Sequence, residues 1–356
     1  MMLKRIDGWW LLSVSGKLIE ERDLLRKGYS RMITSLSVKT AAIPIFFLLL
    51  AVQVDAATVE KKDVTEVYGE PAGLILTGRL GFGYLSGEAH EYVYWPKVGG
   101  HTASELTWEM DSTLMVGIGA TIRSTPWLNL GVDLWFNVND GDGYMEDYDW
   151  LLPGVNWTDK SVHDNTDVTS AIMFDINAEV TFFSANGFVF NGIAGFRRDR
   201  FEWEARGGSY IYSINSFRDT AGTFPPQALA ITYEQTLDAP YFGVAVTGDF
   251  GPVHLAAKVT GSIFVRGKTT DQHHMRDLVS YGDFNEGEMW GVDVALAYDI
   301  TDHIGIKVAY LYEYYDTIKG NSKWCYSPYG YCASYVNNAG VDLETSLFSV
   351  AAVYSF

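Results

Sequence analysis

Four side chains in two short segments of the sequence have types and spacings that suit the activation of water. Asp147 and Asp149 are two residues apart in an acidic run, and Asp271 is followed two residues later by His273. In an extended chain, residues two apart point to the same side, so each segment would present its two groups together. A fold that sets the two pairs face to face would form a carboxylate and imidazole site able to activate water for hydrolysis.

Other chemistries find weaker support. Ser161 and His273 could be drawn as a serine-type pair, but no Gly-x-Ser-x-Gly motif surrounds the serine. There is no His-Glu-x-x-His zinc motif, and the run 139–143 lacks the spacing of an EF-hand calcium loop. We therefore expect no metal and no cofactor. Taken alone, the acidic residues could equally be a solvated rim, and His273 with His274 an incidental metal-binding pair.

The chain has 356 residues, 47% of them hydrophobic, which is enough for a large domain. The one run that approaches membrane-helix character, residues 41–52, is shorter than the roughly 20 apolar residues that span a bilayer. Basic residues precede this run and small residues follow it, which is typical of a secretory signal peptide. We expect Met32 to be the natural start, residues 1–31 an over-called upstream extension, residues 32–56 the signal peptide and residues 57–356 the mature domain.

The mature domain is strongly acidic. Residues 1–56 hold 8 basic and 5 acidic residues, so the net charge of −18 for the whole chain becomes −21 for the remainder. A protein this acidic is a poor partner for nucleic acid and attracts cationic substrates, although simple solubility explains the charge as well.

The cysteines Cys325 and Cys332 lie close together in a loop-like segment near the end of the chain. In an exported protein, such a pair is expected to form a local disulfide. A metal-binding pair is the alternative, but no histidine or further cysteine lies nearby in the sequence.

Alternation of apolar and polar residues dominates the sequence from about residue 74 onward. In the stretch 172–182, for example, apolar residues alternate with Asp175, Asn177, Glu179 and Thr181. This period of two predicts β-strands. We expect about ten strands, at residues 74–94, 103–123, 128–138, 167–183, 188–212, 230–248, 253–266, 287–299, 304–317 and 341–356.

Two all-β architectures share this pattern. A soluble sandwich would bury its apolar face, whereas a transmembrane barrel turns apolar residues to the lipid. The barrel is favoured by long strands, by an aromatic closing strand, and by short turns alternating with long polar stretches around 137–166, 213–229, 266–287 and 317–340. We expect a ten-stranded antiparallel transmembrane β-barrel with long extracellular loops. Its narrow lumen would be filled by side chains, so its function should lie at the outer mouth.

Several segments of the chain resemble the omptins, the outer-membrane proteases of Gram-negative bacteria. They are residues 147–150, 157–166, 205–213, 271–273 and 320–322, together with the final strand. The similarity extends across essentially the whole mature chain, with the motifs in the family's order. The resemblance implies an endopeptidase in the outer membrane, acting as a monomer, with its active site facing outside and with peptides or proteins as substrates.

The resemblance also implies roles for the four residues. Asp147 and Asp149 would form an Asp–Asp couple on one wall of an extracellular groove, and Asp271 and His273 an Asp–His couple on the other. A water held between the couples would attack the peptide carbonyl, with His273 as general base and Asp271 orienting its ring. The acidic couple would position the water and stabilise the oxyanion. One of its carboxyls could hold a proton, because two close carboxylates do not both ionise readily.

Substrate preference is where the sequence departs from the family. Glu91 matches a family glutamate that helps to bind a basic side chain before the cut, but the second acidic position of that pocket is Thr269 here. Asp159 matches an acidic residue that favours a basic residue after the cut. We expect cleavage beside basic residues, with the preference before the cut weakened by the loss of one carboxylate.

Lipopolysaccharide is the other ligand that the resemblance implies, as an activating ligand bound through its lipid A phosphates. Arg198 and Arg200 could serve on the outer wall, but the position near Thr236 has lost its charge and Glu234 lies close by. The site would be only partly preserved. Alternatively, the two arginines simply lie in the lipid headgroup zone, where basic residues are common.

Two other functions compete with the protease hypothesis. The first is a non-enzymatic barrel, an adhesin, whose loops bind ligands on host surfaces. The second is a closed pore for ions or solutes. The presence of all four residues of the two couples favours the enzyme.

Overall fold

The computed structural model describes residues 4–6, 9–11, 74–327 and 330–356, in two compact units of residues 1–66 and 67–356. In the first unit, β1 (Lys4–Ile6) and β2 (Trp9–Leu11) form an antiparallel pair. The expected start at Met32 and the expected signal peptide lie outside the described residues. Within the described residues, no helix is both long and apolar enough to cross a membrane.

The second unit consists almost wholly of antiparallel strands. They are β3 (Ile75–Trp95), β4 (His101–Thr125), β5 (Leu128–Asn137), β6 (Gly141–Asp149), β7 (Asp159–Ala185), β8 (Phe188–Arg206), β9 (Ser209–Tyr212), β10 (Thr220–Thr223), β11 (Leu229–Phe250), β12 (Val253–His273), β13 (Leu278–Asp299), β14 (Ile304–Tyr326) and β15 (Tyr331–Ser355). Two short 3-10 turns, η1 (Pro96–Val98) and η2 (His274–Arg276), follow β3 and β12. Each strand predicted from the alternation overlaps one of the long strands.

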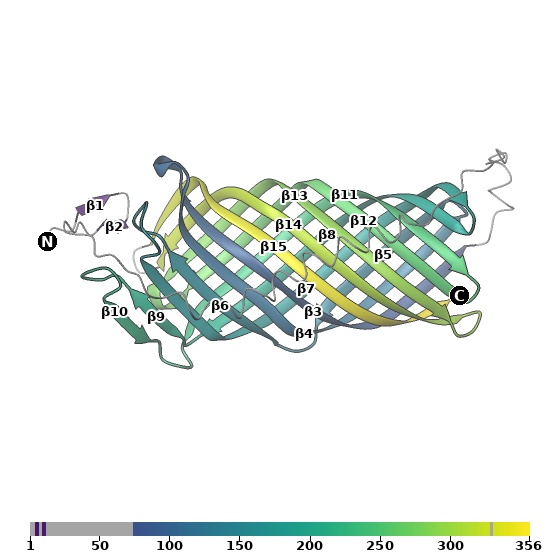
Figure 1. Cartoon of the computed structure of the whole chain (residues 1–356), viewed down its shortest axis with the longest axis horizontal. Helices are drawn as coiled ribbons and strands as arrows, with labels where there is room; N and C mark the ends of the chain where they lie inside the picture. The colour runs from purple at the N-terminus through teal and green to yellow at the C-terminus, as the bar shows by residue number, and fades with distance from the viewer. Residues whose placement is uncertain (1–3, 7–8, 12–73, 328–329) are drawn as a thin grey trace, which may run out of the picture. The chain divides into compact units, whose positions relative to one another are not determined.

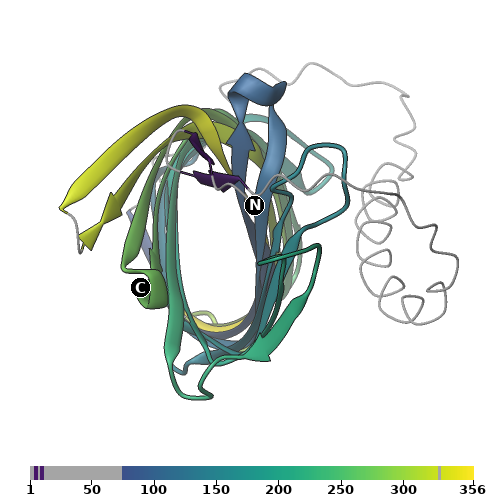
Figure 2. The same ribbon diagram turned by 90° about the vertical axis from the view of Figure 1, so that its left-hand side faces the viewer.

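The sheet closes into a barrel. Its strands pair in the order β3, β4, β5, β7, β8, β11, β12, β13, β14 and β15, and β15 pairs back with β3. Like β5, β6 pairs with β4 on one side and β7 on the other, so β5 and β6 share one position and the ring has ten positions. Figure 2 shows the ring end-on. β9 and β10 form a hairpin that pairs with the start of β7. The predicted antiparallel barrel is confirmed.

The barrel turns its apolar side chains outward. On β3, Leu80, Phe82 and Tyr84 are exposed, whereas Gly81 and Leu85, at positions of the opposite face, are buried. Exposed large apolar residues recur on β4, β5, β7, β11, β12, β13, β14 and β15. A soluble sandwich would bury such residues, whereas an outer-membrane barrel presents them to lipid. The exposure pattern therefore decides between the two architectures.

The two ends of the barrel differ (Figure 1). The turn end holds the C-terminus and tight turns such as 186–187, and the hairpin end holds the tips of β6, β9 and β10. The stretches 137–166, 266–287 and 317–340, predicted as loops, are mostly strand at the hairpin end. Outside the lipid, polar residues are allowed on both faces of a strand. The alternation therefore disappears from the sequence although the backbone pairing continues.

Charged side chains fill the part of the lumen nearer the turn end. Arg79 pairs with Asp133 at 2.9 Å, and Arg197 pairs with Asp175 at 3.1 Å and with Glu313. A cavity of about 110 Å³ lies among these groups. Arg79 and Arg197 each have a carboxylate partner, which offsets the cost of burying their charges in the lumen.

Apolar side chains fill the lumen nearer the hairpin end. Trp108, Trp203 and Tyr233 are fully buried and lie against one another, with ring centroids 5.2 Å apart for Trp108 and Tyr233 and 5.7 Å apart for Trp203 and Tyr233. We call these three residues the aromatic floor. They belong to a larger buried cluster that includes Leu85 and Met145. A substrate entering from the hairpin end can therefore reach only the residues above the floor.

Arg197 and Arg198 offer a matched test of this inside-out packing, because they are adjacent on β8 and face opposite sides. Arg197→Met would leave Glu313 buried without its cation, so we expect the free energy of unfolding to fall by about 3–5 kcal/mol. Arg198→Met removes only an exposed pair with Asp238 and should cost less than about 1 kcal/mol. Urea unfolding in lipid vesicles, followed by tryptophan fluorescence, measures both changes. Equal losses would contradict the assignment of the two faces.

Candidate active site

The acidic couple lies on β6, which runs extended between β4 and β7 at the hairpin end. Asp147 and Asp149 are two residues apart, so they face the same side. Asp147 is only 7% exposed, and its Oδ1 accepts a hydrogen bond from the Ser104 hydroxyl at 3.1 Å. Met145, two residues further in, pairs in register with Trp108. The acidic couple therefore stands directly above the aromatic floor.

The Asp–His couple lies at the end of β12. Asp271 is buried, and its Oδ2 lies 2.7 Å from Nε2 of His273. This contact orients the imidazole ring and leaves Nδ1 as the nitrogen that can accept a proton. Asp271 pairs in register with Tyr233, so this couple begins at the level of the aromatic floor, beside it.

The two couples face each other across the lumen. Around the ring, β6 and β12 are separated by β7, β8 and β11 on one side and by β4, β3, β15, β14 and β13 on the other. Across this gap, the charge of His273 lowers the pKa of Asp147 and the charge of Asp271 raises it. Such influence requires short distances between the groups. The structure thus brings together the four residues that the sequence analysis selected.

Burial raises the pKa of both carboxyls of the acidic couple. It raises the pKa of Asp147, and repulsion by Asp271 adds to this effect, whereas nearby cations and the hydrogen bond from Ser104 oppose it. Burial raises the pKa of Asp149 well above its usual value, and the adjacent charge of Asp147 contributes. Of the two carboxyls, Asp149 has the more strongly raised pKa, so it is the one that favours its protonated form more.

Arg276 and Tyr212 complete the site, although the sequence analysis did not select them. Arg276 lies in η2, and its charge lowers the pKa of both Asp147 and Asp149. Its guanidinium group hydrogen-bonds Tyr212 of β9. In the sequence, the only sign of Arg276 is that it follows His273 by three residues. The turn that brings it back to the acidic couple depends on how β12 pairs with β13, which the sequence does not reveal.

The expected substrate-binding residues lie at two depths. Glu91 on β3 and Thr269 on β12 are buried inside the site, at 7% and 6% exposure. Asp159 lies at the rim, at the start of β7, where it pairs in register with Asp149. Its Oδ1 accepts a hydrogen bond from the backbone N–H of Ser213 at 2.8 Å. A substrate would therefore meet Asp159 first and the other two residues only after entering.

The serine-type alternative is not assembled. Ser161 is buried on β7, opposite Asp147 in register. Among the described residues it makes no hydrogen bond to His273, whose Nε2 faces Asp271 instead. The same part of the chain contains no group of three or more His, Cys, Asp or Glu arranged to hold a metal ion.

Arg198 and Arg200 lie apart from the two couples, on the outer face of β8. Each forms a two-point ion pair with β11: Arg198 with Asp238 at 2.6 and 2.8 Å, and Arg200 with Glu234 at 3.0 and 2.9 Å. An incoming phosphate group would have to compete with these carboxylates.

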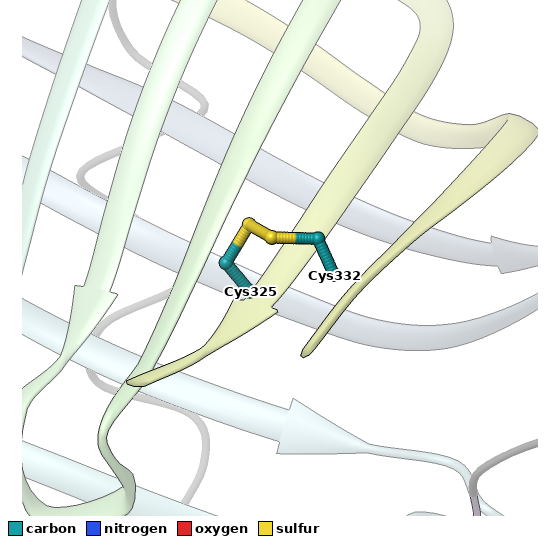
Figure 3. The surroundings of a disulfide bond; sticks show 2 residues. All are labelled: Cys325 and Cys332. Carbon is teal, nitrogen blue, oxygen red and sulfur yellow. A yellow bond between two sulfur atoms is a disulfide. The ribbon is translucent and has the colours of Figure 1, made fainter. Parts of the chain in front are cut away.

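Cys325 and Cys332 lie opposite each other near the tips of β14 and β15 and form a disulfide (Figure 3). The bond joins two strands that are already paired, so it reinforces the end of this strand pair.

Known proteins with the same architecture are similar to this chain in sequence. The sequence model of the Omptin family matches residues 74–356. The chain is 27% identical over 285 residues to the outer membrane protease OmpP of Escherichia coli K12, covering 79% of this chain and 90% of that protein. It is 29% identical over 242 residues to the plasminogen activator of Yersinia pestis, covering 68% and 76%. The crystal structure of the outer membrane protease OmpT from Escherichia coli superposes with a TM-score of 0.77 at 25% identity, covering 81% of this chain and 98% of that chain.

The protonation of the acidic couple can be tested directly. Ser104→Ala removes a hydrogen bond to ionised Asp147, and Arg276→Met removes a nearby cation, so each should raise the pKa of Asp147. Arg276→Met should also raise that of Asp149. NMR titration of protein labelled with ¹³C at the aspartate carboxyls, in lipid nanodiscs, measures these changes. Lys323→Met, which removes an exposed cation on β14, is the control, and the same upward change in that variant would argue against a specific contact.

Proposed function

The chain belongs to the omptin family of outer-membrane proteases of Gram-negative bacteria, and on that premise we propose that its acidic couple and its Asp–His couple together hydrolyse peptide bonds. The observation that supports this most directly is that Asp147 and His273 lie on opposite walls at the same end of the barrel, where the charge of His273 lowers the pKa of Asp147. A water molecule between these walls would lie beside both a base and an acid.

In the proposed mechanism, Nδ1 of His273 accepts a proton from the water while Asp271 holds Nε2 and stabilises the imidazolium that forms. The resulting hydroxide attacks the carbonyl carbon of the peptide bond. Ionised Asp147 orients the water, and protonated Asp149 donates a hydrogen bond to the oxyanion of the tetrahedral intermediate. The imidazolium then gives its proton to the leaving amine as the C–N bond breaks, which restores the neutral histidine.

Arg276 has a supporting part in this proposal. Its positive charge favours the ionised form of Asp147, and it lies close enough to the acidic couple to offset negative charge as the oxyanion develops. All of these groups come from one barrel, so we propose that a single chain is sufficient for activity.

Cationic peptides are the proposed substrates. The net charge of −21 beyond residue 56 attracts them to the barrel, and Asp159 offers a carboxylate at the rim, next to the acidic couple. We propose that Asp159 binds a basic side chain that follows the cut. The position before the cut lies deeper, near Glu91 and Thr269.

Lipopolysaccharide enters the proposal as a ligand of the outer wall rather than of the site. The guanidinium groups of Arg198 and Arg200 suit lipid A phosphates, but each is already paired with a carboxylate of β11. We propose weak binding, in which the phosphate displaces Asp238 and Glu234. Activity should therefore be assayed both with and without lipopolysaccharide.

Removal of either couple should abolish cleavage. We expect Asp147→Asn and His273→Ala each to lower kcat/KM by about 10²–10⁴-fold, because each removes a proton-handling group. Asp142→Asn, on the same strand but exposed, is the matched control and should change little. Hydrolysis of a quenched fluorescent peptide by refolded protein measures the rates. If Asp147→Asn or His273→Ala cleaved as fast as the parent, the mechanism would be wrong and the adhesin alternative would gain support.

The rim preference has its own test. Asp159→Asn should slow cleavage of peptides with Arg or Lys after the cut by roughly fivefold, as for a partly exposed ion pair, and leave peptides with an uncharged residue there unaffected. Mapping of cleavage sites in a mixed peptide pool by mass spectrometry gives both rates. An equal effect on the two groups of peptides would mean that Asp159 does not contact that side chain.

A further inference from the structure

Glu91 is a buried acid without a cation. It is only 7% exposed, and among the described residues it forms no ion pair. The residues that pair with it in register, Leu106 on β4 and Val341 on β15, are buried and apolar. The ionisable groups that face it come from across the lumen: Asp271 on β12, Asp147 on β6 and Tyr233 on β11. None of these is a positive charge that would stabilise an ionised Glu91.

Two of the carboxyl oxygens in this group have no partner. Oε2 of Glu91 and Oδ1 of Asp271 are both buried, and neither takes part in a hydrogen bond among the described residues. The other oxygen of Asp271, Oδ2, is engaged by His273. An unpaired buried oxygen is costly, and two acids can satisfy each other only if one of them has a proton to donate.

The proton belongs on Glu91 rather than on Asp271. Burial raises the pKa of Glu91 well above its usual value, and the charges of Asp271 and Asp147 raise it further. Asp271, in contrast, has the imidazole of His273 beside it to stabilise its negative charge. Adjacent carboxyls share protons as a unit, so ionisation of the second acid is delayed to higher pH.

We propose that Glu91 is a positioning residue that retains its proton and donates a hydrogen bond to Oδ1 of Asp271. A neutral Glu91 offers no counter-ion, so the substrate side chain that lies beside it is uncharged. The inference rests on the proposed function, because it assigns Glu91 a task in orienting the Asp–His couple. It replaces the expectation that Glu91 is the counter-ion of a basic side chain. Asp271 then has both oxygens engaged and presents His273 in one orientation.

The surroundings of Glu91 support an uncharged substrate side chain before the cut. The aromatic floor borders this place, with Tyr233 in register with Asp271. Thr269, two residues before Asp271 on the same face of β12, offers a hydroxyl and no charge. With Glu91 neutral, a guanidinium or ammonium group entering here would be desolvated without a counter-ion of its own, which is unfavourable. An apolar, aromatic or small polar side chain before the cut fits this environment.

Two substitutions separate the positioning role from a counter-ion role. Glu91→Gln keeps the shape, the neutral state and a hydrogen-bond donor, so it should keep kcat/KM within about threefold and leave the preference before the cut unchanged. Glu91→Ala removes the donor and should lower kcat by about 10- to 100-fold, the loss expected for a hydrogen bond to a charged group. Glu88→Gln, on the same strand but exposed, is the control.

The pH dependence of peptide cleavage is a second test, because a purely structural role of Glu91 would not change it. Above its raised pKa, Glu91 ionises and repels Asp271, so activity of the parent protein should fall on the alkaline side. Glu91→Gln cannot ionise, and its activity should persist to higher pH. If the parent protein cut after Arg or Lys and Glu91→Gln lost that preference by more than about tenfold, Glu91 would be a charged counter-ion and the proposal would be overturned.

An infrared difference spectrum tests the protonation without any substrate. The parent protein at neutral pH should show the carbonyl band of a protonated carboxyl group that is missing in Glu91→Gln, and heat-dependent migration in gels verifies that both barrels are folded. Absence of that band overturns the proposal even if the protein is an active protease. Presence of the band together with an inactive parent protein would instead count against the proposed function alone.

Discussion

Inside a bilayer, every backbone N–H and C=O group has to find a partner within the protein, and this constraint determines the rest of the structure. The sheet satisfies it by closing, with residues 339–355 of β15 paired with residues 77–93 of β3. Closure in turn decides which strands lie opposite each other, and it sets β6 across from β12. The two couples lie on paired strands rather than in loops, so strand register sets their positions.

The contents of the lumen decide what the acids at the hairpin end can do. Below them, the buried aromatic floor fills the lumen, and the ion pairs of the lower lumen lie beyond it. With solvent on one side only, burial raises the pKa values of Asp149 and Glu91 well above those of the same groups in water. A group of fully ionised carboxylates would merely bind cations, whereas a mixture of protonated and ionised ones can both donate and accept protons. The floor thus contributes to chemistry without touching the substrate.

Basic residues on the outer wall are not sufficient to form a phosphate-binding site. Arg198 and Arg200 lie on the outer wall, where a phosphate of a lipid headgroup could reach them, yet each is engaged by an acid on the neighbouring strand. On β8 a shift by one residue moves a side chain from this outer wall to the lumen, as Arg197 and Arg198 show. The function of a basic residue in such a barrel therefore depends on the face of the strand that it occupies and on the side chain that pairs with it on the neighbouring strand.

The sequence by itself determined the class of fold and the two couples, because lipid imposes a period of two on residues such as Leu80, Phe82 and Tyr84, and because extended chain places residues two apart on one face. It failed at the strand ends, where water accepts polar residues on both faces and the period is lost. Only the tertiary structure decided that Ser104 and Arg276 join the acidic couple and that Glu91 has no cation beside it. These contacts depend on strand register and on the circumference of the closed ring, which are global properties that no local pattern of residues records.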